Sequence, residues 1–332
     1  MMNKITYGCL LLLCMVACNT GTASVKQATS AQPVTVNRFD KTLLRWIERG
    51  DSAALDSLYA VYPDMLDVLG KAVLNLRSLD VPGFMDRIHD YYAEPTLLQL
   101  YKDAVAYYAT VDDIEEQLGH GFSFLKANFP DMVIPKVYMH VSGFGQNVLA
   151  ADSLLSLSID KYMGVDFPLY QQFFHDYQRV KMQRARCAMD YLAGWIMSEF
   201  PFSGNENVLL DRMIYQGKVQ YVLSLAFPGM DPAFSMGYTP RAYQWCVEHE
   251  GGIWRAIIQR KHLFTPDKMT TDKYFEDTPS EFLADEAPGN IGVWIGWQIV
   301  KRYMEETNAT LATLMEQGNA QDFLNISRYK PE

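Results

Sequence analysis

The stretch LLDRMIYQGKVQYVL (residues 209–223) combines a helical apolar pattern with a stripe of polar side chains. Its leucine, methionine, isoleucine and valine residues favour a helix that packs into a core. Asp211, Gln216, Lys218 and Gln220 interrupt that pattern. Charged and polar groups inside a core must be paired, because an unpaired group there is costly. The stretch therefore predicts a buried helix that carries either a polar network or one wall of a groove.

Two charged residues from later helical segments join this stripe in one candidate site. Arg255 lies in TPRAYQWCVEHEGGIWRAIIQRKHLF, and Glu286 directly precedes APGNIGVWIGWQIV. The candidate polar groove consists of Asp211, Gln216, Lys218, Gln220, Arg255 and Glu286. We expect these side chains either to pair inside the core or to line a groove for a peptide or a glycan.

Large aromatic residues on the same segments are expected to fill the core around this site. They are Trp254, Trp294, Trp297, Tyr215 and Tyr221. Each would bury a large apolar area between neighbouring helices. Pro288 and Gly289 precede an apolar helical pattern, which predicts a helix N-terminus with free backbone N–H groups. A carboxylate such as Glu286, or a bound anion, would satisfy those groups.

The composition is that of a globular protein with a large core. The chain has 332 residues, of which 49% are hydrophobic, 13% aromatic and 20% charged. The formal net charge is −10, and the densest positive cluster is KMQRAR (residues 181–186), which we interpret as a solvated helix face. Phosphate binding relies on clustered Lys and Arg, so nucleic acid is not an expected partner.

The first 17 residues have the pattern of a bacterial lipoprotein signal peptide. Lys4 precedes an apolar stretch that is too short for a membrane span, and MVAC (residues 15–18) resembles a lipobox with Met15 in place of leucine. The pattern predicts cleavage before Cys18 and membrane attachment through acyl chains on that cysteine, palmitate among them. A plain secretory signal with an incidental cysteine is the alternative. Either reading places the mature chain outside the cytoplasm.

Cleavage would leave two cysteines in the body of the protein. Cys9 and Cys14 belong to the signal segment, whereas Cys187 and Cys246 lie in helical patterns. Two cysteines do not form a disulfide framework. Both a single bridge and two buried free thiols remain open.

The rest of the chain divides into a tether and one domain. Residues 18–37 are rich in Ser, Thr, Ala and Gln without an apolar period, which predicts a flexible tether. Residues 38–332 contain no internal repeat or low-complexity break, so we expect a single, mostly helical globular domain.

Helical and strand-like patterns alternate once within the domain. Residues 39–128 have helical spacing, with Thr110 and Asp113 expected to cap the last helix of this region. Residues 134–160 alternate in the manner of short strands, which predicts a small antiparallel sheet. Helices resume to the end of the chain, one of them starting with Thr239 as N-cap and Pro240 behind it. The expected fold class is α+β.

The sequence contains no recognisable catalytic or metal-binding motif. No two of its six histidines are spaced i, i+2 or i, i+4, the spacings that let one element offer two imidazoles to a metal. HEGGI (residues 249–253) is half of an HExxH motif, with Ile253 where the second histidine would stand. Nucleophile-elbow, Walker, C-x-x-C and dinucleotide motifs are missing. We therefore predict no enzymatic activity, no catalytic residues, no metal and no cofactor.

The order of elements resembles that of gluzincin-type peptidases. Those enzymes place an HExxH helix after a small sheet, and a second helix supplies a glutamate ligand. Here AMDYLAGWI (residues 188–196) takes the place of the first motif without any histidine, and Gln216 and Gln220 stand where glutamates would be. A neutral amide is a poor ligand for Zn²⁺, so the resemblance implies such a fold without its metal site.

Several blocks in the second half resemble the gliding-motility lipoprotein family GldB of Bacteroidetes. They are LLSLSIDKYMGVDFPLY, LLDRMIYQGKVQYVLSLAFPG, YTPRAYQWCVEHEGGIW, APGNIGVWIGWQIVKRYM and the closing LNISRYKPE, which together span about residues 154–332. The resemblance implies an envelope lipoprotein associated with gliding and its secretion machinery, without enzymatic activity or cofactor.

These observations lead to one principal hypothesis and two alternatives. The first is a non-catalytic, lipid-anchored envelope protein that works through contacts with envelope protein partners. No acidic export signal follows Cys18, so we expect it at the outer membrane, facing the periplasm. The alternatives are a divergent metallopeptidase-like hydrolase and a periplasmic pseudoenzyme that binds peptides or glycans.

Overall fold

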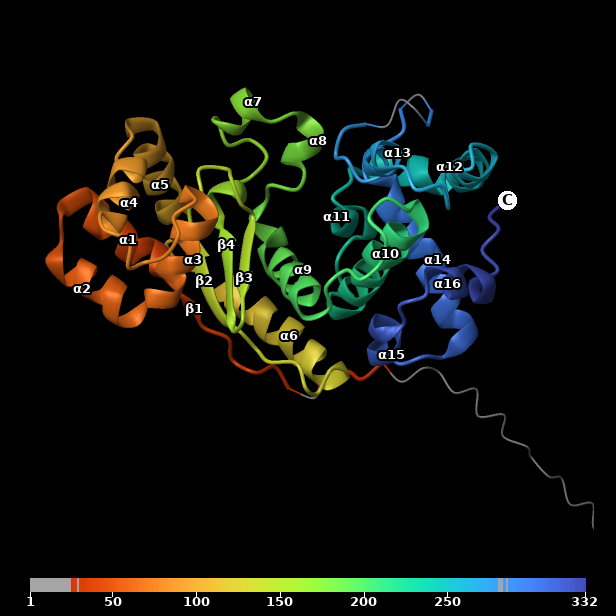
Figure 1. The fold of residues 1–332 in the computed structure, drawn as a ribbon, viewed down its shortest axis with the longest axis horizontal. Coiled ribbons are helices and arrows are strands. Elements are labelled where there is room, and N and C mark those ends of the chain that lie inside the picture. The colour runs from red at the N-terminus through yellow and green to blue at the C-terminus, as the bar shows by residue number, and fades with distance from the viewer. Residues whose placement is uncertain (1–24, 29, 280–282, 285) are drawn as a thin grey trace, which may run out of the picture.

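A small four-stranded sheet stands between an N-terminal and a C-terminal group of helices (Figure 1). The computed structural model describes residues 25–28, 30–279, 283–284 and 286–332. The predicted signal peptide and Cys18 lie outside these residues. The α+β fold class is confirmed, because helices dominate and surround one small sheet.

The N-terminal part of the chain forms six helices, as the apolar pattern over residues 39–128 predicts, and the last of them lies on the side of the sheet where the C-terminal helices pack (Figure 1). They are α1 (Phe39–Arg49), α2 (Ser52–Val61), α3 (Pro63–Leu74), α4 (Phe84–Tyr92), α5 (Pro95–Tyr107) and α6 (Asp112–Asn128). The expected cap of α6 is wrong. Val111 holds the N-cap position without a side-chain hydrogen bond, and Asp113 instead pairs with Arg184, 2.5 Å away.

The sheet differs from the expected antiparallel one. Its strands are β1 (Val36–Asn37), β2 (Lys136–His140), β3 (Val148–Ala151) and β4 (Leu154–Ser158), in the order β1-β2-β4-β3. The β1–β2 and β2–β4 pairs are parallel, and the β3–β4 pair is antiparallel. The sheet is mixed because the β3–β4 hairpin folds back so that β4, which is buried at every position, lies beside β2. Strands covered on both faces are typical of parallel pairing.

The segment predicted to be a flexible tether is partly structured. Residues 25–28 and 30–37, here called the strap, run along α6 and end in β1, which pairs with β2 (Figure 1). The backbone of Lys26 bonds to Asn128, and that of Gln32 bonds to Ser123. The expectation of a flexible tether over 18–37 is therefore corrected for this part, because α6 supplies partners for its backbone.

The C-terminal group begins with short turns and continues with longer helices. Its elements are η1 (Ile159–Lys161), α7 (Tyr170–Phe173), α8 (Asp176–Arg179), η2 (Arg184–Arg186), α9 (Cys187–Glu199), α10 (Leu209–Ala226), α11 (Pro232–Met236), α12 (Pro240–Gln259), α13 (Lys268–Lys273), α14 (Ile291–Thr307), α15 (Leu311–Glu316) and α16 (Ala320–Ser327). Thr239 caps α12 as predicted, since its hydroxyl accepts the N–H of Ala242 at 3.1 Å. The predicted helix start after Gly289 is also confirmed, at Ile291.

Two glycines let α10 and α14 pack unusually close together. A Cβ on Gly217 would lie 2.3 Å from the carbonyl carbon of Gly296, and a Cβ on Gly296 would lie 1.8 Å from the carbonyl oxygen of Met213. Backbone therefore meets backbone at this crossing. Trp294 and Trp297 on α14 and Trp254 on α12 are buried around it, as expected, while Tyr215 and Tyr221 are half-buried.

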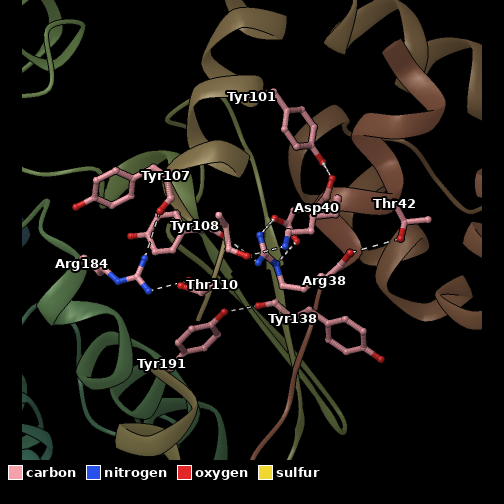
Figure 2. A network of polar contacts seen from close by, with 12 residues as sticks. Arg38, Asp40, Thr42, Tyr101, Tyr107, Tyr108, Thr110, Tyr138, Arg184 and Tyr191 are labelled. Carbon is pink, nitrogen blue, oxygen red and sulfur yellow. Dashed lines mark hydrogen bonds and ion pairs between the residues drawn. The ribbon is translucent and has the colours of Figure 1, made fainter. Parts of the chain in front are cut away.

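A network of polar contacts joins the start of α1 to the turn between α5 and α6 (Figure 2). The Arg38 guanidinium donates to both carboxylate oxygens of Asp40, at 2.9 and 2.6 Å, and to the carbonyl oxygen of Tyr108 at 2.6 Å. Arg184 donates to the carbonyl oxygen of Thr110 from the other side, at 2.9 Å. Two arginines from distant segments thus hold the same turn.

Candidate functional site

The six residues of the candidate polar groove do not line one groove, although Asp211 and Lys218 share a small cavity of about 50 Å³ beside the end of α15. Lys218 is buried, and its ammonium donates to the carbonyl oxygens of Met315 at 3.2 Å and Gln317 at 2.9 Å. It therefore satisfies carbonyl groups at the end of α15, as cations at helix C-termini do. Burial lowers the pKa of Lys218 to about 8.

The other polar residues of α10 point to different neighbours. Asp211 accepts the backbone N–H of Asn205 at 2.8 Å, and Gln220 donates to the Ser235 hydroxyl at 2.7 Å. Gln216 is half-buried between them along the helix. Asp211 and Gln220 thus hold the loop before α10 and helix α11 in place, and Gln220 does not line the cavity that Asp211 shares with Lys218.

Arg255 and Glu286 are exposed, and their neighbours come from other parts of the chain than those of the polar residues on α10. Arg255 lies on the outer side of α12, beside the last residues of the chain. Glu286 pairs with Arg241 through two contacts of 2.9 Å. The expectation of one groove made by all six residues is corrected, because Asp211 bonds to the loop before α10, Lys218 to the end of α15 and Gln220 to α11.

A buried polar cluster that the sequence reasoning missed lies where α9, α10 and α11 meet. Arg186 is 8% exposed and donates to Asp190 at 2.9 Å and to the carbonyl oxygens of Phe234 and Ser235. Tyr162 donates to the second oxygen of Asp190 at 2.8 Å. The prediction that KMQRAR (residues 181–186) is a solvated helix face is therefore wrong for Arg186, which is buried. The i, i+4 spacing of Arg186 and Asp190 was the available signal, since it places the two side chains on one helix face.

The donor set of this cluster does not suit a metal ion. It offers one carboxylate, that of Asp190, together with hydroxyls and the Gln220 amide, and the Arg186 guanidinium fills its centre. Zinc prefers several Cys, His or carboxylate ligands, and a fixed cation repels it. No group of three or more such side chains occurs within the described ranges. The gluzincin likeness stays a prediction about fold alone.

A surface groove opens at the start of α12, between the α7–α8 region and the segment before α14. Its volume is about 370 Å³, within the usual range for ligand pockets. Tyr177 and Val180 form one wall, Trp245 and Ala242 another, and Pro288 part of the third. Most of this lining is apolar or aromatic, so the groove can bury apolar side chains of a ligand.

The charged residues at the rim of the groove are paired with each other. Lys181 bonds to Asp277, and Arg241 bonds to Glu286 at 2.9 Å. Beyond Arg241 the groove continues over Trp245, whose ring stacks on His249 at 4.3 Å with an interplanar angle of 7°. Lys181 and Arg241 thus each face a carboxylate, and the continuation over Trp245 adds the carboxylate of Glu248, which accepts from the Gln244 amide at 2.9 Å.

A family comparison covers almost the whole chain. The model of the family described as gliding motility protein GldB matches residues 22–331. The chain belongs to the GldB family. No curated protein matches the chain, and no solved structure does. Membership in the GldB family makes the protein a gliding-motility-associated lipoprotein, which is lipid-anchored in the cell envelope.

No helix among the described residues combines the length and the apolar character that crossing a bilayer requires. The two body cysteines, Cys187 and Cys246, are both free and buried, so the second of the two open alternatives is correct. Burial raises the pKa of each thiol to about 12, which makes both poor nucleophiles.

Proposed function

We propose that this protein is a non-catalytic adaptor of the outer membrane, anchored through acyl chains on Cys18 and facing the periplasm. It acts by binding an envelope protein partner of the gliding and secretion machinery. The groove at the start of α12 is the contact site. The observation that carries this proposal is the combination of an open apolar groove at the surface with a polar cluster inside whose charges, Arg186 and Asp190, pair with each other.

The interior offers little chemistry to a substrate. Arg186, Asp190 and Tyr162 bond to one another, and Lys218 bonds to backbone carbonyls. His140 is fully buried, and its Nδ1 lies 2.8 Å from the Ser156 hydroxyl. A general acid, base or nucleophile must reach the reacting atom. Arg186, Asp190, Tyr162 and Lys218 are engaged in holding helices together, and the ring of His140, whose Nε2 has no partner among the described residues, is enclosed in the core.

The lining of the groove indicates which kind of ligand it can bind. An apolar lining with compensated rim charges favours a neutral segment with apolar or aromatic side chains, because burying an unpaired charge there would be costly. Tyr177 and Trp245 provide flat surfaces of the kind that dominate protein–protein binding energy. We therefore assign the groove to an extended, uncharged segment of the partner protein.

Site-specific photocrosslinking in cells tests this proposal. A benzophenone amino acid replaces Trp245 in the groove or Tyr59, which is 46% exposed on α2 and serves as the control position. We expect a discrete crosslinked protein from position 245 and not from position 59. The Trp245→Ala variant should lose co-purification of the same protein from detergent extracts of the envelope.

Two results would contradict the proposal. Identical crosslinking patterns from both positions would show that the groove is not the contact site. Stoichiometric zinc in the purified protein, together with zinc-dependent hydrolysis, would instead support the metallopeptidase alternative.

A further inference from the structure

The strap is held by one face of helix α6. It runs antiparallel to the helix, so that its first residues meet the C-terminal end of α6 and its last residues meet the N-terminal end. Glu115, Gly119 and Ser123 follow each other at four-residue intervals and therefore share a face. Asn128 continues the contact at the helix end.

The hydrogen bonds between α6 and the strap, here called the clamp, all involve the backbone of the strap. Asn128 accepts the N–H of Lys26 at 3.0 Å and donates to its carbonyl oxygen at 2.9 Å. The Ser123 hydroxyl accepts the N–H of Gln32 at 2.7 Å, and Glu115 accepts the N–H of Val36 at 2.7 Å. Both Ser123 and Asn128 are buried beneath the strap.

Gly119 makes the close approach possible. A Cβ at this position would lie 2.7 Å from the carbonyl oxygen of Gln32, closer than non-bonded atoms pack. Glycine inside a helix costs about 1 kcal/mol relative to alanine. Helix α6 thus has a residue of low helix propensity at the point where the strap crosses it.

The C-terminal end of the strap is also held by contacts with the domain. Val36 and Asn37 pair with Val137 and Tyr138 of β2. Arg38 follows immediately, and Figure 2 shows its guanidinium between Asp40 and the carbonyl oxygen of Tyr108. The strap therefore joins the domain without a hinge between β1 and α1.

We propose that this clamp fixes the distance and the orientation of the domain relative to the bilayer. The inference rests on the proposed acylation of Cys18. Only seven residue steps separate Cys18 from Val25, where the described strap begins. A fully extended chain spans at most about 3.5 Å per residue, so the strap begins within about 25 Å of the anchor. A free tether up to Arg38 would allow about 70 Å.

The place on the domain where the strap begins indicates which surface faces the membrane. The strap begins beside the C-terminal end of α6 at the lower edge of Figure 1, whereas α8, α12 and α13 lie at the upper edge. The C-terminal end of α6 therefore faces the membrane. The groove at the start of α12 points away from it, toward partners that approach from the aqueous side.

The test uses the full acylated chain in vesicles of phosphatidylethanolamine and phosphatidylglycerol that carry a nitroxide-labelled headgroup. A fluorophore is attached to Asp131→Cys, which follows α6, or to Gln171→Cys on α7. Both native positions are exposed, while Cys187 and Cys246 are buried and stay unlabelled. We expect at least twofold stronger quenching at position 131 than at position 171.

Hydrogen exchange on the same vesicles reports on the clamp itself. The amides of Lys26, Gln32 and Val36 should exchange at least 100-fold more slowly than in an unstructured chain. Gly119→Ala should raise their exchange at least tenfold and reduce the quenching difference, although it favours the helix itself. Gly252→Ala is the matched control, since a Cβ there meets nothing within 4 Å.

The possible failures are distinguishable. Protein that does not float with the vesicles overturns the acylation of Cys18 and the inference together. Protein that floats but is quenched equally at both positions overturns the orientation alone. Strap amides that exchange as fast as free chain, while α6 stays protected, overturn the clamp.

Discussion

Three buried basic side chains make three different sets of polar contacts. Arg186 pairs with a carboxylate and two carbonyl groups, and Lys218 bonds to carbonyl groups only. His140 bonds to a serine hydroxyl through Nδ1, and its Nε2 has no partner among the described residues. A buried charge is stabilised by several partners at once, whereas a buried imidazole can remain neutral.

Removing the charge of Arg186 should destabilise the protein strongly. Arg186→Leu leaves Asp190 without its cation and removes one donor from each of the Phe234 and Ser235 carbonyl groups. We expect a loss of about 3 kcal/mol in the free energy of unfolding, measured by urea denaturation. Arg241→Leu serves as the control. Its exposed ion pair with Glu286 should change stability by less than about 1 kcal/mol, and equal losses would contradict the assignment.

His140 should make stability depend on pH. Burial lowers the pKa of His140 to about 3, below its ordinary value of 6.5. At a pH between these two values, His140 binds a proton in the unfolded chain but not in the folded chain. The contribution of His140 is complete above pH 6.5 and is lost as pH falls toward 3. Between pH 6.5 and 5 the loss amounts to about 2 kcal/mol.

The measurement is the difference in unfolding free energy between the wild type and His140→Leu at several pH values. The difference cancels the opposite trend from Asp160 and Asp40, whose pKa values burial raises. We expect the wild type to lose stability more steeply than the variant on acidification. Parallel pH profiles would show that His140 is protonated in the folded protein.

At the scale of elements, the helices were predictable and the sheet connectivity was not. Apolar spacing and the signals at Thr239 and Pro240 located most of the long helices. Strand β1 has only two residues and lies in a stretch with a polar composition, so no periodicity could reveal it. The direction of β2 relative to β4 depends on how the β3–β4 hairpin folds back, which local sequence does not specify. The burial of β4 on both faces decides it.

The crossing of α10 and α14 should tolerate no side chain at Gly217. Alanine normally stabilises a helix by up to about 1 kcal/mol relative to glycine. Here its Cβ would collide with the backbone of Gly296, so we expect Gly217→Ala to lower the free energy of unfolding by about 1–3 kcal/mol. Gly252→Ala should be neutral or stabilising in the same denaturation assay. A stabilised Gly217→Ala variant would show that the helices separate easily.

At the scale of the whole molecule, the candidate site was harder to predict than the fold. The sequence drew attention to polar residues on α10, but their partners come from α11 and from the end of α15. The groove combines side chains from α8, α12 and the segment before α14. Such a surface depends on how distant elements pack, and none of its residues forms a motif by itself.

The continuity of the core predicts that the domain unfolds as a unit. Buried apolar residues from Val36 to Tyr329 form one connected cluster that passes from the sheet through α6 and α9 to the C-terminal helices. We expect a single calorimetric transition whose van't Hoff and calorimetric enthalpies agree. Two resolved transitions would show that the two helical groups are separate domains.

The strap also determines how the protein responds to mechanical load. A pull on the anchored end reaches Lys26 first, then Gln32, then Val36, and finally the parallel pairing of β1 with β2. Hydrogen bonds loaded one after another yield at low force, while paired strands loaded along their length resist together. Tension would therefore first lengthen the tether and only afterwards strain the domain, which would let the end that carries the groove move relative to the membrane while the fold stays intact.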